Sequence, residues 1–103
     1  MHPADDVSTK LLTKQLVDHG KPSYTRTARN KTPVLYDGRE DEVQIGRGIV
    51  HGDGKDVTIV ACGVMVSRSL EAAELLRADG IGATVVDMPT LKPLDTDLLD
   101  RLA

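Results

Sequence analysis

Asp56-Val-Thr-Ile-Val-Ala-Cys-Gly63 is the stretch that decides the fold of this 103-residue chain. The residues from Val57 to Val60 are all β-branched, which is typical of a strand that is covered on both faces in a parallel sheet. Gly63 closes the run and can lead the chain into a turn. We therefore predict a central parallel strand here.

A helix and a second strand follow this stretch. The apolar residues that recur at helical spacing are Val66, Leu70, Ala73 and Leu76. Their stripe ends at Asp79-Gly80, and Ile81–Met88 then has the composition of a second buried strand. A strand, helix and strand of these lengths form a right-handed parallel crossover in nearly all known proteins. The sequence thus predicts an α/β fold with a Rossmann-like, three-layer parallel sheet.

The last residues predict one more helix, from Leu94 to Leu102, with Asp95 or Thr96 as its cap. No third parallel strand follows in this sequence. Because a sheet of two or three short strands leaves its edges exposed, we expect this α/β domain to be incomplete.

The N-terminal part has its own pattern. Val7–His19 predicts an amphipathic helix that is capped by Asp5 or Asp6 and ended by Gly20. Ser23–Thr27 is rich in β-formers and predicts a short strand that needs a sheet to join. This part is interpreted as the helix-strand remnant of a second α/β domain.

A loop or linker is predicted between Ala28 and Glu42, where no period is sustained. We place a domain boundary near Asp41, which divides the chain into residues 1–41 and 42–103. Val43–Val50 is a weaker strand candidate because Gly46 and Gly48 interrupt it.

Composition excludes some partners. The net charge is −3 and aromatic residues make up 2% of the chain, so neither a basic field nor stacking platforms for nucleic acid are expected. No apolar stretch approaches the ~20 residues that cross a bilayer, so no membrane partner is expected. Cys62 is the one cysteine and cannot form an internal disulfide, which indicates a reducing compartment, by default the cytoplasm.

Two glycine-containing loops invite an anion-binding interpretation. Gly46-Arg-Gly48 precedes a strand and lacks the spacing of a dinucleotide-binding loop, so it is not interpreted as one. Cys62-Gly-Val-Met65 opens a helix, where free N–H groups can hold an anion, but every strand-to-helix turn has this property.

The cysteine and the histidines give no catalytic pattern. Cys62 lies in an apolar run with no histidine near it in sequence, so we interpret it as an inert buried thiol. His2, His19 and His51 lack metal-ligand spacing and are interpreted as surface residues.

Arg26 and Arg29 are the binding candidates. They lie where the predicted strand Ser23–Thr27 opens into a loop, the position at which α/β proteins bring side chains to ligands. A guanidinium group can hold phosphate with two parallel hydrogen bonds. The alternative interpretation is ordinary surface charge.

Taken together, several motifs in this order resemble the C-terminal domain of the transketolase family. They are Gly54–Gly63, Val64-Met-Val66, Leu70-Glu-Ala-Ala73, Gly80-Ile81, Val85-Val-Asp-Met88 and Leu91-Lys-Pro-Leu-Asp95. Upstream, Pro3-Ala-Asp5, Gly20–Arg26 and Lys31–Tyr36 resemble the last helix, last strand and exit linker of that family's pyrimidine-binding domain.

The resemblance implies an enzyme that uses thiamine diphosphate and Mg to transfer a two-carbon ketol unit between sugar phosphates. The cofactor ligands, metal ligands and catalytic groups of that family all precede the first residue of this sequence. The chain is therefore expected to bind no cofactor and to be inactive alone. It is expected to act in a homo-oligomer or with a partner subunit that carries the diphosphate-binding domain.

One binding role is implied for residues of this chain. The family's sugar-phosphate arginine after the last strand of the pyrimidine-binding domain falls at Arg29, with Arg26 as its neighbour. The alternatives are a fragment of deoxyxylulose-phosphate synthase, a fragment of a 2-oxo acid dehydrogenase β subunit, or a non-catalytic assembly module.

Overall fold

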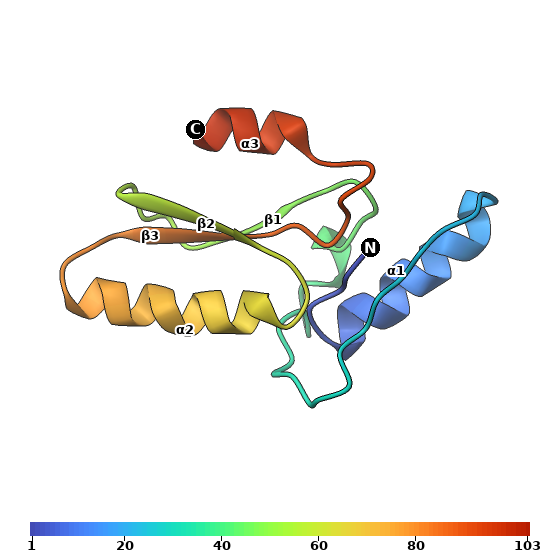
Figure 1. Ribbon diagram of the computed structural model, residues 1–103, viewed down its shortest axis with the longest axis horizontal. Helices are drawn as coiled ribbons and strands as arrows, with labels where there is room; N and C mark the ends of the chain where they lie inside the picture. The colour runs from blue at the N-terminus through green and yellow to red at the C-terminus, as the bar shows by residue number, and fades with distance from the viewer.

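A three-stranded mixed sheet lies between two helices in the computed structural model, which describes residues 1–103 (Figure 1). The strands are β1 (Ile49–His51), β2 (Val57–Ala61) and β3 (Ala83–Asp87), in the order β1-β3-β2. Helix α2 (Met65–Ala78) covers one face and α3 (Thr96–Leu102) the other. The predicted α/β class and three-layer arrangement are confirmed.

The predicted parallel crossover is also present. β2 pairs with β3 in parallel, from Val57 opposite Ala83 to Ala61 opposite Asp87, and α2 connects the two strands. Gly80 follows α2 with a φ of 81°, the left-handed conformation that glycine adopts without strain. The carboxyl ends of β2 and β3 therefore meet at one edge of the sheet.

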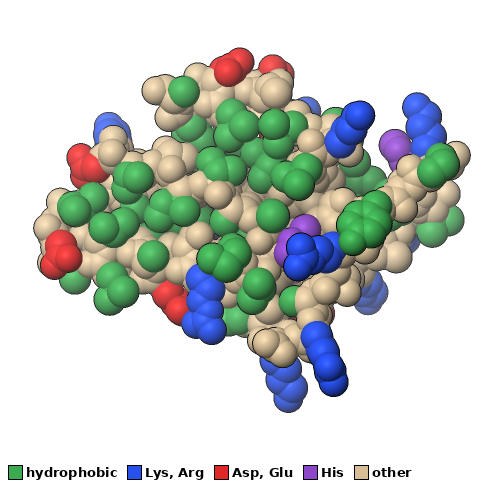
Figure 2. Space-filling view, viewed as in Figure 1, with side chains coloured by type: hydrophobic (Ala, Val, Ile, Leu, Met, Phe, Trp, Pro, Cys, Tyr) green, Lys and Arg blue, Asp and Glu red, His purple; other side chains and the backbone are tan.

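The prediction that the stretch 56–63 forms the central strand was wrong. β3 is central and its residues from Thr84 to Asp87 are buried, whereas β2 is an edge strand with Val57 39% and Val60 50% exposed. β-branched composition favours a strand but does not decide its neighbours, and here β1 pairs with the other side of β3. Figure 2 shows apolar side chains exposed over the region of β2 and α2.

β1 departs from the predicted parallel sheet in its direction. It is antiparallel to β3 and comprises only the residues from Ile49 to His51, at the end of the run Val43–Val50. Gly46 has a φ of 81°, and the Gly48 N–H donates to the Asp95 carboxylate rather than to a strand. These two glycines keep the earlier part of the run out of the sheet.

The N-terminal helix is confirmed as α1 (Asp6–His19), and Asp5 rather than Asp6 is its cap. The Asp5 carboxylate accepts a hydrogen bond of 2.7 Å from the Ser8 N–H, and the Ser8 hydroxyl group faces back to the Asp5 N–H. Gly20 ends the helix in the left-handed conformation. At the other end of the chain, Asp95 caps α3 by accepting from the Leu98 N–H.

The predicted strand Ser23–Thr27 does not form. Its only backbone pairing is with Met1, whose ammonium group donates to the Tyr24 carbonyl and whose carbonyl accepts from the Arg26 N–H. A strand needs a neighbouring strand to satisfy its remaining backbone groups, and no other strand of this chain lies beside it.

The main apolar core joins the two parts of the chain. Its buried members are Ala4, Leu12, Tyr36, Val43, Ile49 and Val66. A smaller cluster, of Val86, Met88 and Leu98, holds α3 on the opposite face of the sheet. The boundary near Asp41 falls in the short 3-10 helix η1 (Glu40–Glu42), and the division at this point stays a prediction. None of the helices is both long and apolar enough to cross a bilayer.

Candidate functional site

Arg26 and Arg29 lie in an irregular segment between α1 and η1, and both side chains are exposed. Neither takes part in the ion pairs of the chain, which join Arg39 to Glu42, Arg68 to Glu71 and Arg77 to Glu74. Their guanidinium groups are thus free to meet an anion at the surface. The phosphate-binding role stays a prediction.

An open hollow of about 670 Å³ lies between α1 and residues 27–34. Its lining includes Lys10 and Lys31, but neither Arg26 nor Arg29. The two candidate arginines therefore do not line this hollow.

Met1 and His2 connect the segment that carries Arg26 and Arg29 to the carboxyl ends of the parallel strands. The His2 N–H donates to the Pro89 carbonyl after β3, and the His2 carbonyl accepts from the Gly63 N–H after β2. Burial, helped by the Arg26 charge and the terminal amino group, lowers the pKa of His2. His2 thus lies at the carboxyl ends of β2 and β3, the place where ligands bind in many α/β proteins.

Cys62 has a histidine beside it in space. Its Sγ lies 3.8 Å from His2 Nδ1, and the side chain is half-buried rather than fully buried. The interpretation of His2 as a surface residue was therefore wrong, because its side chain is half-buried beside Cys62, which lies 60 residues away in the sequence. The anion interpretation of the loop 62–65 gains no support, because the N–H groups of Gly63 and Met65 are bonded within the chain.

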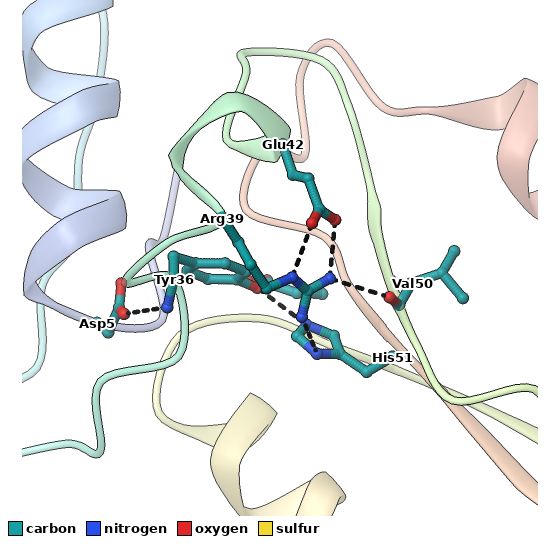
Figure 3. Close-up of polar contacts among 7 residues, drawn as sticks. Asp5, Tyr36, Arg39, Glu42, Val50 and His51 are labelled. Atoms are coloured by element: carbon teal, nitrogen blue, oxygen red, sulfur yellow. Dashed lines mark hydrogen bonds and ion pairs between the residues drawn. The ribbon is translucent and has the colours of Figure 1, made fainter.

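A second polar cluster surrounds Tyr36, and we call it the Tyr36 network. Its members are Tyr36, Asp87, His51, Arg39 and Glu42. The Tyr36 hydroxyl group donates to Asp87 Oδ2 at 2.6 Å and lies 3.1 Å from His51 Nε2. Figure 3 shows Arg39 between His51 and Glu42, with Tyr36 beside them.

The donors and acceptors of the Tyr36 network form one directed chain. Because the single hydroxyl proton of Tyr36 is given to Asp87, its oxygen accepts from His51, which places the imidazole proton on Nε2. The other nitrogen, Nδ1, then accepts from Arg39 at 3.1 Å. Glu42 holds the same guanidinium group with two hydrogen bonds of 2.7 Å. A neutral His51 with its proton on Nε2 is consistent with every hydrogen bond of the network.

The charges of the Tyr36 network follow from burial. Asp87 is fully buried, and burial raises the pKa of its carboxyl group from 3.8 to about 6, against the Tyr36 hydrogen bond, which lowers it. Burial raises the pKa of Tyr36 and lowers that of His51, which keeps both neutral near pH 7. The Glu42 hydrogen bond raises the pKa of Arg39.

The Tyr36 network is not evident in the sequence. The interpretation of His51 as a surface residue was wrong, because it is half-buried between Tyr36 and Arg39. One signal is available: Asp87 ends the apolar run Val85-Val86, and a carboxylate in a buried strand needs a partner. Nothing in the spacing indicates that the partner is Tyr36, 51 residues away.

Comparisons with known proteins agree with this fold. Residues 46–103 match the family model of the transketolase C-terminal domain. The whole-chain fold superposes on a solved split-gene transketolase, described as an inactive β4 tetramer, with a TM-score of 0.91 and 44% identity over 98% of this chain and 33% of that one. The chain belongs to the transketolase family.

Two curated relatives show how the family varies. The chain is 37% identical over 98% of its length to an apulose-4-phosphate transketolase subunit of Phocaeicola vulgatus, and covers 32% of that protein. It is 38% identical over its whole length to 1-deoxy-D-xylulose-5-phosphate synthase of Synechococcus sp., and covers 16% of that protein. The chain spans about a third of the length of several curated relatives that it matches.

The side chains of this chain do not form a metal site. No three His, Cys, Asp or Glu side chains among residues 1–103 lie together as a set that could hold a metal ion. The residues present therefore do not fit the magnesium diphosphate that the family resemblance implies.

Proposed function

We propose that this chain supplies the C-terminal part of a thiamine diphosphate-dependent enzyme that transfers a two-carbon ketol unit between sugar phosphates. The observation that carries the proposal is the likeness to the split-gene transketolase over 98% of the chain. In this proposal residues 1–41 end the pyrimidine-binding domain and residues 42–103 begin the C-terminal domain. The cofactor and its magnesium ion are held by other parts of the enzyme.

The dependence on those other parts is directly testable. We expect no ketol transfer from the purified 103-residue chain with thiamine diphosphate and magnesium, and transfer from the complete enzyme, in which the rest of the pyrimidine-binding domain and the diphosphate-binding domain are present on the same chain or on a partner subunit. Product formation from a ketose phosphate donor and an aldose phosphate acceptor measures this. Turnover by the isolated chain, free of contaminating enzyme, would refute the proposal.

Arg29 is proposed to hold the non-reacting phosphate of the substrate, with Arg26 as the neighbouring candidate. Both guanidinium groups are exposed and lack carboxylate partners in this chain, which supports the proposal. A bidentate contact to a remote phosphate would position the substrate carbonyl group without entering the reaction.

Arg29→Ala in the complete enzyme is expected to raise the KM for a phosphorylated donor about tenfold, as expected for the loss of a charge-assisted hydrogen bond, with a smaller change in kcat. The KM for a non-phosphorylated donor should change little. Arg68→Ala is the matched control, because Arg68 is an exposed arginine on α2 that pairs with Glu71. Equal losses for both donors would contradict the phosphate role.

A second candidate function is deoxyxylulose-phosphate synthesis, favoured by the whole-length match to the Synechococcus enzyme. The two functions differ in the donor. Assays of the complete protein with pyruvate and with a ketose phosphate, each against an aldose phosphate acceptor, separate them.

A further inference from the structure

Residues 26–34, which we call the arginine segment, are held at their two ends. At the first end the Arg26 N–H donates to the Met1 carbonyl at 2.9 Å. At the second end, just beyond the segment, the N–H groups of Leu35 and Tyr36 donate to Asp5 Oδ2 at 2.7 and 3.1 Å. No hydrogen bond of the chain involves residues 27–34. Among the hydrogen bonds of this chain, these end anchors are therefore the ones that fix the position of Arg29.

Tyr36 holds the second anchor from two sides. Its backbone N–H binds the carboxylate that caps α1, and its hydroxyl group binds Asp87 at the carboxyl end of the central strand. The side chain is completely buried in the main core, together with Leu12 of α1 and Val66 of α2. One residue thus connects the helix, the segment and the sheet.

The Tyr36 hydroxyl group is further fixed by the network. It accepts from His51 of β1, whose other nitrogen is held by Arg39, and Arg39 is held by Glu42 and lies over the Tyr36 ring at 5.9 Å. A hydroxyl group that donates once and accepts once has a single orientation, and this removes rotational freedom from the anchor. By contrast, Tyr24 is 77% exposed, and its side chain makes no hydrogen bond.

We propose that Tyr36 is a positioning residue that fixes the arginine segment relative to the sheet by joining Asp5 to Asp87. The inference rests on the proposed function only for its effect on the substrate. The mechanical part concerns the place of residues 26–34 and holds for any function of the chain.

The mechanical part is tested by a distance in the complete protein. Spin labels on Asn30→Cys, in the arginine segment, and Glu71→Cys, on helix α2, in a Cys62→Ser background, report the distance between the segment and the layer formed by α2. We expect Tyr36→Phe to broaden or shift this distance distribution and Tyr24→Phe to leave it unchanged. An unchanged distribution in folded Tyr36→Phe protein overturns the proposal, whatever reaction the enzyme performs.

Asp87→Leu serves as a second variant, and as the decisive one where Tyr36→Phe lowers the yield of folded protein. Leucine has nearly the shape of aspartate. It carries no charge, and removing the buried charge favours folding. The Tyr36 hydroxyl group, however, loses its acceptor in the sheet. The same broadening is expected. A distribution identical to that of the wild type overturns the proposal.

The effect on the substrate is a separate readout. Tyr36→Phe is expected to raise the KM for a phosphorylated donor about fivefold with kcat nearly unchanged, as the loss of one hydrogen bond predicts. The non-phosphorylated donor should be unaffected. If the distance distribution broadens but the KM changes equally for both donors, Tyr36 still positions the segment, and the phosphate-binding role of the segment is refuted.

Discussion

Gly54→Ala is expected to destabilise the chain by about 3 kcal/mol, a large effect for the addition of one methyl group. A Cβ atom on residue 54 would lie 2.2 Å from the Gly82 carbonyl carbon and 2.3 Å from the Ala83 nitrogen. Both are backbone atoms, which cannot rotate away as the end of a flexible side chain can. The turn before β2 or the start of β3 must therefore move.

The hydrogen bonds around Gly54 oppose that movement. The Thr84 hydroxyl group donates to the Gly54 carbonyl at 2.8 Å, and the Gly82 carbonyl accepts from the N–H groups of Asp56 and Val57. The Asp56 carboxylate in turn accepts from the Gly82 N–H at 2.6 Å. Separating the two backbones would break several of these bonds at once.

Urea denaturation followed by circular dichroism measures the loss of stability. Gly80→Ala is the matched control, because Gly80 has a φ of 81° and no atom near its would-be Cβ. Alanine there adds backbone strain of about 1 kcal/mol without a clash. Equal losses of stability in Gly54→Ala and Gly80→Ala would contradict the close approach of residue 54 to the backbone of Gly82 and Ala83. Since Gly54 lies at the opposite end of β2 from the carboxyl edge, the KM values of a complete enzyme should not change.

The helices were predictable because their signals are local. Asp5 and Asp95 lie directly before the helices that they cap. Gly20 and Gly80 follow the last residues of α1 and α2 and end these helices. Caps and closing glycines act over three or four residues, so a short stretch of sequence contains the whole interaction.

The order of the strands was not predictable in the same way. Val57–Val60 is as β-branched as a central strand, yet β2 is at the edge because β1, a three-residue strand at the end of a glycine-interrupted run, pairs with the other side of β3. Strand neighbours depend on contacts between distant residues, which composition does not record. For the same reason Ser23–Thr27 had the composition of a strand without a partner.

The candidate site likewise has a part that the sequence predicts and a part that it does not. Arg26 and Arg29 belong to one contiguous stretch of sequence, whereas the Tyr36 network joins separate parts of the chain through the sheet pairing itself. His51 reaches Tyr36 because β1 pairs with β3, which places His51 opposite Val85, two residues from Asp87 on the same strand.

Asp87→Leu is expected to change how stability depends on pH. Burial raises the pKa of Asp87 from 3.8 to about 6, so the folded protein binds this proton more tightly than the unfolded chain does. The stability that the protonated group contributes is complete below about pH 4 and is lost as pH rises through 6. At about 1.4 kcal/mol per pKa unit, the loss is about 3 kcal/mol.

The free energy of unfolding of Asp87→Leu relative to wild type should therefore rise by most of that amount, about 2.4 kcal/mol, between pH 4 and pH 7. The comparison cancels the contributions of ionisable groups outside the Tyr36 network, because those groups have the same surroundings in both proteins. Urea denaturation at half-unit pH intervals measures the difference. Parallel curves for the two proteins across this range would show that the Asp87 carboxyl group titrates normally.

His51→Gln provides a control of opposite sign. Burial, and secondarily the Arg39 charge, lowers the pKa of His51, so the stability contributed by the neutral ring is complete above about pH 6.5 and is lost as pH falls through the lowered pKa. Protonation would also place an N–H on Nδ1, facing the Arg39 donor. Relative to wild type, His51→Gln should gain stability as the solution is acidified, whereas Asp87→Leu should lose it. If both variants changed in the same direction, the assignment of a neutral His51 beside a buried, ionised Asp87 would be wrong.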